Sequence, residues 1–191
     1  LQFEDQGDFD AYPRDKESDL ALLEAEGCDM VFMGSLEEFF PEFSDLAKID
    51  ILPAGPHGSG LEEQFRPGHL DGVRTIVERL FCTVGPSSAY FGEKDFQQTL
   101  VVSDLAREMG YPTIVVCPTV REDSGLALSS RNVRLSPDEK NLAHQIYPAL
   151  LAARDVWQSG ERTADRLSAA MTDHLNHDGL IVEYAEVRDP A

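Results

Sequence analysis

The sequence predicts an α/β fold, in which an open parallel sheet of the doubly wound type is followed by a smaller C-terminal α+β domain. Strand, helix and strand patterns alternate through the middle of the chain. The run TIVVC at 113–117 is rich in β-branched residues, as in parallel strands that are covered on both faces. Beyond Pro137 the pattern changes to two helices and one strand. These observations predict a first domain at 1–135 and a second at 136–191.

Local patterns predict each element in turn. Apolar residues spaced three and four apart indicate helices, alternating or β-branched runs indicate strands, and glycine and proline end both. The predicted elements are a helix at 15–26 that ends at Gly27, a strand at 28–33, a short helix at 37–43, a strand at 48–53, a loop at 54–60, a helix from His69 that stops at Gly85, a strand at 88–92, a helix at 94–109, a strand at 113–117, helices at 138–158 and 163–177, and a strand at 180–187.

Composition excludes several classes of partner. The chain has 191 residues and a formal net charge of -19, which repels nucleic acid and anionic membrane surfaces. It has no apolar run long enough for a membrane span or a secretory signal, so we expect a cytoplasmic protein with neither kind of partner. The three cysteines, Cys28, Cys82 and Cys117, lie in or beside apolar runs and lack metal-site spacing, which predicts reduced core thiols.

A first polar cluster, FGEKDFQQ at 91–98, directly follows a predicted strand and opens a helix. This position supplies free backbone N–H groups and the positive end of a helix dipole. Gly92 lets the backbone approach a ligand closely, and Lys94 can reach a phosphate. Asp95 can cap the helix or accept a hydrogen bond from a ribose hydroxyl. A charged turn with a helix cap is the alternative interpretation of this cluster.

A second polar cluster, GLALSSRN at 125–132, follows the predicted strand 113–117. Ligands of open parallel sheets bind beyond the carboxyl ends of the strands, so this segment should lie over the same sheet edge as Lys94. The hydroxyls of Ser129 and Ser130 and the guanidinium of Arg131 suit phosphate oxygens. A helix cap does not explain them, because the next helix has its own start at Ser136-Pro137. The cluster predicts an anion site.

The paired segments AYFGEKDFQQ and PTVREDSGLALSSRN resemble the pantothenate synthetase family, also called pantoate–beta-alanine ligases, of the nucleotidylyltransferase-like superfamily. LQF, DFDAYPRD, RPGHLDGV and VEYAEVRD are similar to family segments in the same order, so the resemblance covers essentially the whole chain. It implies a Rossmann-like first domain and a homodimer. It also implies a two-step reaction, in which the pantoate carboxylate attacks the α-phosphate of ATP and releases pyrophosphate, and the amine of β-alanine then displaces AMP.

The resemblance also implies roles for individual residues. Lys94, Ser129, Ser130 and Arg131 would act in catalysis by stabilising charge on the phosphates, together with Mg²⁺, and Gln2 and Gln98 would hold pantoate, with Gln2 also near β-alanine. Tyr12 and Asp19 fall in segments near the family's pocket, and Asp19 is a weak candidate for a metal ligand. The implied ATP-binding residues are Gly92, Glu93, Lys94, Asp95, Val120, Leu128, Ser129, Ser130 and Arg131.

The chain also departs from the family pattern. The family's His-x-Gly-His-like turn, whose histidines contact ATP, has no counterpart, and His69 is expected to be a loop or helix-start residue. We therefore expect an internal portion of the enzyme, which by itself would be aggregation-prone or partly molten and would make no detectable pantothenate. Two alternatives remain: a non-catalytic nucleotide-binding α/β module, if this chain is the whole natural product, or another nucleotidylyltransferase.

Overall fold

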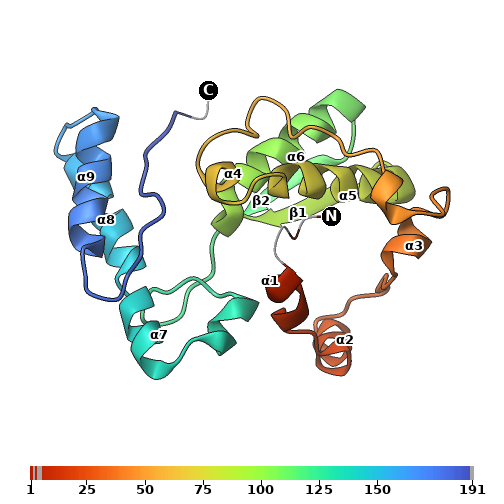
Figure 1. Cartoon of the computed structure of the whole chain (residues 1–191), viewed down its shortest axis with the longest axis horizontal. Coiled ribbons are helices and arrows are strands. Elements are labelled where there is room, and N and C mark those ends of the chain that lie inside the picture. Colours follow the sequence, from red (N-terminus) through yellow and green to blue (C-terminus); the bar gives the residue numbers. More distant parts are fainter. Residues whose placement is uncertain (2, 4–5, 190–191) are drawn as a thin grey trace.

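A computed structural model describes residue 1, residue 3 and residues 6–189 of the chain (Figure 1). The α-helices are α1 (Gln6–Ala11), α2 (Lys16–Ala25), α3 (Leu36–Phe39), α4 (Glu62–Phe65), α5 (His69–Val84), α6 (Phe96–Met109), α7 (Pro137–Ala143), α8 (Ile146–Gln158) and α9 (Ala164–Leu175). The strands are β1 (Ser88–Gly92) and β2 (Thr113–Cys117), and short 3-10 helices are η1 (Leu46–Lys48), η2 (Glu93–Asp95) and η3 (Ser130–Arg134).

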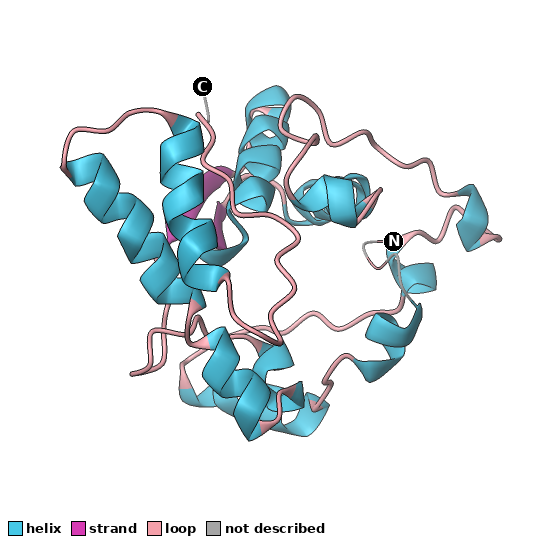
Figure 2. Cartoon of the chain, turned by 60° about the vertical axis from the view of Figure 1, so that its left-hand side comes forward, coloured by secondary structure: helices cyan, strands magenta, loops and turns pink. Residues whose placement is uncertain are grey.

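The two strands form a parallel pair joined by α6, which confirms the predicted strand, helix and strand unit. The register runs from Ser88 beside Thr113 to Gly92 beside Cys117. Both strands therefore end at the same edge of the sheet, and this edge leads into η2 and α6. Figure 2 shows how small the magenta pair is beside the helices, and the mixture of helix and parallel sheet confirms the α/β class.

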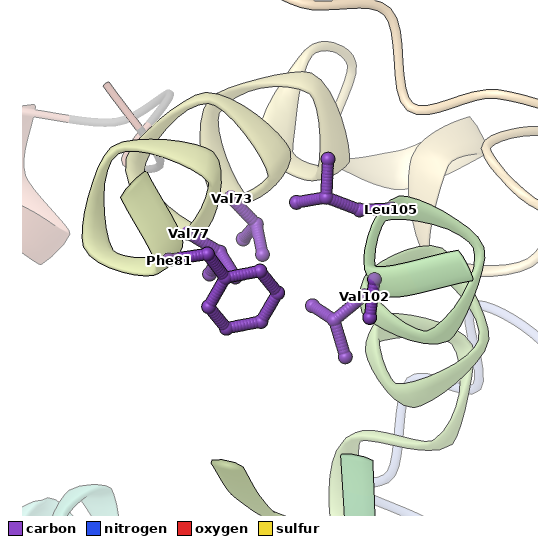
Figure 3. Close-up of a cluster of buried hydrophobic side chains, with 6 residues drawn as sticks. Val73, Val77, Phe81, Val102 and Leu105 are labelled. Carbon is purple, nitrogen blue, oxygen red and sulfur yellow. The ribbon is translucent and has the colours of Figure 1, made fainter. Parts of the chain in front are cut away.

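A hydrophobic core holds α5 and α6 against the strands. Val73, Val77 and Phe81 of α5 face Val102 and Leu105 of α6, as Figure 3 shows. Ala89 and Phe91 of β1 and Ile114 of β2 pack against this cluster. Tyr90, which alternates to the opposite face of β1, is 69% exposed. The prediction that 113–117 is covered on both faces is wrong for the described residues, because α5 and α6 share one face.

The strands predicted at 28–33 and 48–53 are also wrong, because both segments are irregular. Lys48 belongs to the 3-10 helix η1, residues 49–53 form neither helix nor strand, and α5 side chains accept backbone N–H groups here and at Ala54. The N–H of Leu52 donates to Thr75 Oγ1 at 2.9 Å, and the N–H of Ala54 donates to Asp71 Oδ1 at 2.6 Å. Segment 28–33 is exposed throughout and pairs with no strand among the described residues. An apolar run alone therefore did not determine strand pairing.

The C-terminal helices differ from prediction at one point. The single helix expected at 138–158 is divided into α7 and α8, with a turn at His144 and Gln145. Pro148 explains the break, because it lacks an N–H and its ring clashes with the carbonyl four residues earlier, at His144. Ser136 caps α7, with Pro137 in the first turn, as predicted.

The segment predicted as a strand at 180–187 is irregular but packed. Ala185 and Val187 lie against the cluster formed by α8 and α9, and the N–H of Val187 donates to Ser168 Oγ at 3.1 Å. In Figure 1 these two helices stand side by side at one end of the molecule. Their cluster is separate from the α5 and α6 core, and the domain boundary at residues 135 and 136 stays a prediction.

Predictions drawn from composition had different outcomes. All three thiols are free, but Cys28 and Cys82 are exposed and Cys117 is half-buried, so the prediction of core thiols is wrong. Phe81 lies on the buried face of α5. Cys82 is the next residue along the helix, so it lies off that face and is exposed. In the described part of the chain, no helix combines the length and apolar character that crossing a bilayer requires.

Candidate active site

A cavity of about 160 Å³ lies where the two predicted polar clusters meet. Four separated segments line it, and its residues are Phe3, Tyr12, Glu62, Arg66, His69, Lys94, Asp95, Gln98 and Arg131. Lys94 and Arg131 line the same cavity, so the two clusters lie together as predicted. The start of α5 and the turn before α6 both reach it, and the positive ends of these helix dipoles favour a negatively charged ligand.

The segment 92–95 carries the first cluster into this cavity. Gly92 ends β1, and a Cβ at this position would meet no atom within 4 Å. Glu93 to Asp95 form η2, so α6 begins at Phe96, two residues later than predicted. Lys94 Nζ lies 2.6 Å from Asp95 Oδ1, and both side chains are partly exposed. Lys94 thus presents a cation at the cavity while a neighbouring carboxylate balances it.

Two adjacent glutamines of α6 have opposite surroundings. Gln97 is buried, and its Nε2 donates to the carbonyl of His57 at 2.8 Å and to those of Ser59 and Gly60 at 3.3 Å. Its Oε1 accepts the N–H of Glu62 at 3.2 Å. Gln98 instead lines the cavity. Gln97 therefore holds the loop at 57–62, and Gln98 is the glutamine that faces the cavity.

The second cluster begins in a small hairpin. The N–H of Leu128 donates to the carbonyl of Val120 at 2.9 Å, and Arg121 bridges with Ala127 in antiparallel fashion. The side chains of Val120 and Leu128 are exposed and do not line the cavity. Gly125 turns the hairpin with φ of +88°, and a Cβ there would lie 2.5 Å from the ring of Tyr147. The hairpin is thereby fixed against α8.

The residues after the hairpin form η3 and reach the cavity through Arg131. Ser129 caps this short helix, because its hydroxyl accepts the N–H of Arg131 at 3.2 Å. The sequence interpretation excluded a helix cap in this cluster. That interpretation was wrong for Ser129, which is the N-cap of η3. The hydroxyl of Ser130 donates to Tyr12 Oη at 3.0 Å. Both serine hydroxyls have partners within the chain, whereas the guanidinium of Arg131 lines the cavity.

Arg131 is held by a carboxylate from the other end of the chain. Its Nη2 lies 2.7 Å and its Nε 3.4 Å from the two oxygens of Asp8, and Arg134 Nη1 lies 2.8 Å from the same carboxylate. Hydrogen bonds from Arg131 and Arg134 lower the pKa of Asp8 to about 2. The hydrogen bond that Arg131 donates to Asp8 in turn raises the pKa of Arg131. Asp8 is therefore ionised near neutral pH.

Four residues of the cavity were not predicted as site residues: Phe3, Glu62, Arg66 and His69. Arg66 Nη1 lies 2.7 Å from Glu62 Oε1, and His69 Nε2 lies 3.7 Å from the same oxygen. His69 is the first residue of α5, as the sequence suggested, but its imidazole is 11% exposed and faces the cavity. The signal was available, because RPGH stands directly before a long amphipathic helix whose first turn can face a ligand.

The predictions for Gln2 and Asp19 have different outcomes. Gln2 lies outside the described residues. Asp19 lies in the first turn of α2 with an exposed side chain and does not line the cavity. Among the residues the structure describes, no three His, Cys, Asp or Glu side chains gather in a set that could hold a metal ion.

The cavity has a local charge that differs from that of the whole chain. Lys94, Arg66 and Arg131 line it against the carboxylates of Glu62 and Asp95. In a chain with a formal net charge of -19, this local excess of cations marks the cavity as a place for an anionic ligand. The planar guanidinium groups and the ammonium suit phosphate and carboxylate groups.

A larger cavity of about 490 Å³ lies on the other side of α6, between that helix and the C-terminal helices. Leu100, Leu150, Met171 and Val187 give it a largely apolar wall, and Gln97 rather than Gln98 faces it. It lacks the lysine and arginine of the two polar clusters. The smaller cavity is therefore the better candidate for binding a phosphorylated substrate.

Comparison with known proteins identifies the family. The family model for pantoate-beta-alanine ligase matches residues 1–191. The chain belongs to this family. It is 42% identical over 192 residues to a pantothenate synthetase of Herpetosiphon aurantiacus, covering 99% of this chain and 68% of that protein. It is 43% identical over 191 residues to the one of Aquifex aeolicus, covering 98% of this chain and 66% of that protein.

Solved structures agree with the family assignment. The crystal structure of a pantothenate synthetase from Thermus thermophilus matches with a TM-score of 0.82 and 45% identity, covering 92% of this chain and 62% of that one. A pantoate-beta-alanine ligase from Francisella tularensis, complexed with beta-gamma ATP and beta-alanine, matches with a TM-score of 0.72 and 30% identity, covering 91% and 63%. The likeness confirms the predicted Rossmann-like fold. The chain spans about two thirds of the length of these relatives or somewhat less.

Proposed function

We propose that this chain contributes the active site of an ATP-dependent ligase that joins pantoate to β-alanine. In the first step a carboxylate oxygen of pantoate bonds to the α-phosphorus of ATP, and the bond to the β-phosphate oxygen breaks to release pyrophosphate. In the second step the β-alanine amine bonds to the acyl carbon, AMP leaves with the electron pair of the broken C–O bond, and the amine loses a proton. The products are pantothenate, AMP and pyrophosphate.

The observation that carries this proposal is the meeting of Lys94, Gln98 and Arg131 in one cavity. Lys94 and Arg131 would stabilise the charge that shifts onto the phosphates as pyrophosphate leaves. Gln98 would orient pantoate by hydrogen bonds. As a neutral amide, it leaves the carboxylate reactive as a nucleophile, whereas a bound cation would weaken it.

The other predicted residues have supporting roles in this proposal. Gly92, Glu93 and Asp95 would lie along the nucleotide with their backbone, and Val120 and Leu128 would contact it through the hairpin. Ser129 and Ser130 would offer hydroxyls to its phosphates. Gln2 would share pantoate with Gln98 and also contact β-alanine.

We propose that Mg²⁺ enters this reaction as part of the substrate, bound to the phosphates of ATP. Magnesium ions commonly bind through substrate phosphates and only one or two carboxylates. The metal would neutralise phosphate charge while Lys94 and Arg131 act on the remaining oxygens. A homodimer and a cytoplasmic location are further parts of the proposal. The homodimer derives from the family resemblance, and the location derives from the composition.

The test replaces Lys94 with alanine in the complete natural protein and measures pyrophosphate release from ATP in the presence of pantoate. The fold should persist, because Lys94 is partly exposed and contacts Asp95 at the surface. Loss of a charge that acts on the transition state should slow release by about a hundredfold or more. Lys48, an exposed lysine that pairs with Asp45 at 3.7 Å outside the cavity, supplies the matched control in Lys48→Ala.

Two outcomes would contradict the proposal. Near-normal release from a folded Lys94→Ala protein would remove this residue from the mechanism. If the unmodified protein bound ATP but released no pyrophosphate with pantoate, the non-catalytic nucleotide-binding module would be the better interpretation.

A further inference from the structure

We propose that Asp8 is a positioning residue, which orients the guanidinium of Arg131 toward the nucleotide. The two residues form a hydrogen-bonded ion pair although they lie 123 positions apart in the sequence. The inference rests on the proposed function, because it assigns the phosphate-facing role to Arg131. It adds a residue of α1 to the machinery, although Asp8 itself does not line the cavity.

The geometry of the pair supports orientation rather than simple charge balance. Asp8 Oδ2 lies 2.7 Å from Nη2, and Oδ1 lies 3.4 Å from Nε. The carboxylate therefore accepts hydrogen bonds along one edge of the planar guanidinium. An arginine has five N–H donors in a rigid planar fork. A carboxylate on the Nε side leaves the Nη1 end to face a ligand, and a two-point bond restricts rotation of the plane.

A second contact between the same two segments fixes the ring beneath Arg131. Tyr12 Oη accepts the Ser130 hydroxyl at 3.0 Å, and the Arg131 guanidinium carbon lies 5.2 Å from the centre of the Tyr12 ring. Phe3 packs edge-on against Tyr12, with ring centres 5.5 Å apart. Arg131 is thus held at its edge by Asp8 and over its face by Tyr12, and Figure 1 shows α1 lying toward this part of the chain.

The charge state of Asp8 suits this role at any physiological pH. Arg131 and Arg134 both bond the carboxylate and lower its pKa to about 2, so it remains an anion throughout the working range. The side chain of Asp8 is only 25% exposed, so water competes with these bonds less than at an open surface. The bond to Arg131 therefore persists without a ligand, and the guanidinium is ready before ATP binds.

A double-mutant cycle in the complete natural protein tests the proposal. Asp8→Asn, Arg131→Ala and the combined variant are compared by the KM for ATP and by kcat in pyrophosphate release. We expect Asp8→Asn to raise the KM for ATP about tenfold, a typical coupling for a contacting charged pair, and to leave the KM for pantoate nearly unchanged. In the Arg131→Ala background Asp8→Asn should have no further effect, because Asp8 acts through Arg131.

Two more variants separate positioning from a general structural role. Asp8→Glu keeps the carboxylate and should restore most of the ATP affinity. Asp8→Glu also keeps the proposal testable if Asp8→Asn folds poorly. Arg134→Ala removes a second described partner of Asp8, which does not line the cavity, and should change the KM for ATP less than about threefold.

The outcomes are distinguishable. Additive effects of Asp8→Asn and Arg131→Ala, an equal loss from Arg134→Ala, or tighter ATP binding in Asp8→Asn would each overturn the positioning role while leaving the proposed function intact. If Arg131→Ala left ATP binding and turnover unchanged, the role of Arg131 in the proposed function would itself fail, and the positioning role would fail with it.

Discussion

Replacing the adjacent residues Gln97 and Gln98 by alanine, one at a time, should produce opposite losses. Gln97 is buried and forms four contacts with the loop at 57–62, of which those at 2.8 Å and 3.2 Å use both ends of the amide. Truncation removes a buried side chain and the hydrogen bonds that it makes to part-buried backbone groups of the loop, so Gln97→Ala should lower the free energy of unfolding by about 2 to 3 kcal/mol. In a chain of this length that corresponds to a fall in Tm of roughly 4 to 12 °C.

Gln98→Ala should act on the ligand. The side chain is half-buried and lines the cavity, so its loss should change the free energy of unfolding by less than about 1 kcal/mol. Losing a hydrogen bond to bound pantoate should weaken pantoate affinity by about tenfold to a hundredfold, and ATP affinity far less.

The assay is urea unfolding followed by far-ultraviolet circular dichroism, combined with calorimetric titration of pantoate and of an unreactive ATP analogue into each variant of the complete natural protein. Each glutamine variant serves as the control for the other, because the two share chemistry, helix and turn. Equal losses of pantoate and ATP affinity in Gln98→Ala would reassign that residue, and unchanged stability of Gln97→Ala would refute the loop-holding role.

Three further results are expected. Asp8→Asn should lower the free energy of unfolding by about 1 kcal/mol at pH 7. This difference from wild type should disappear as the pH falls from about 4 to about 2, because the lowered pKa of Asp8 stabilises the fold only while the carboxylate is ionised. Urea unfolding at stepped pH checks the sign. Gly125→Ala should cost about 2 kcal/mol or more in thermal unfolding, because φ is +88° and the new Cβ meets Tyr147, whereas Gly92→Ala should leave stability unchanged, and the reverse order would contradict the backbone argument. Gly92→Ala should nevertheless weaken ATP binding in calorimetry, and unchanged affinity would show that the backbone of Gly92 does not approach the nucleotide closely.

The sequence predicted best those elements whose patterns are both long and bounded. The helix from His69 to Gly85 and the strand, helix and strand unit through TIVVC have strong periodicity and clear glycine or proline ends, and the structure confirms them. The strands predicted at 28–33, 48–53 and 180–187 failed for a physical reason. An apolar run shows that a segment has side chains to bury, but a strand also needs a neighbouring strand that pairs with its backbone hydrogen-bonding groups.

The site was predicted in part for a similar reason. Lys94, Asp95, Gln98 and Arg131 stand in compact polar runs after strands, and all four line the cavity. Arg66 and Glu62 were missed, because their position depends on the loop that Gln97 holds. Nothing local in the residues around Asp8 indicates a bond to Arg131, since the two lie 123 residues apart in the chain. Such long-range partners are visible only in the folded structure.

That separation also affects how the chain folds. The α5 and α6 core joins elements that are near neighbours in sequence, whereas the cavity requires the contacts between 8–12 and 130–131 to close almost the whole first domain into one loop. Closing long loops costs entropy before any contact rewards it, so contacts of this kind form late and are among the first to open. These contacts are already formed without a ligand, and a ligand that touches both segments would stabilise the closed loop further. Saturating ATP at about a hundred times its Kd would stabilise the protein by roughly 2.7 kcal/mol. Hydrogen exchange in the backbone of 8–12 should report this protection even though α1 is remote in sequence from the strand edge where the nucleotide is proposed to bind.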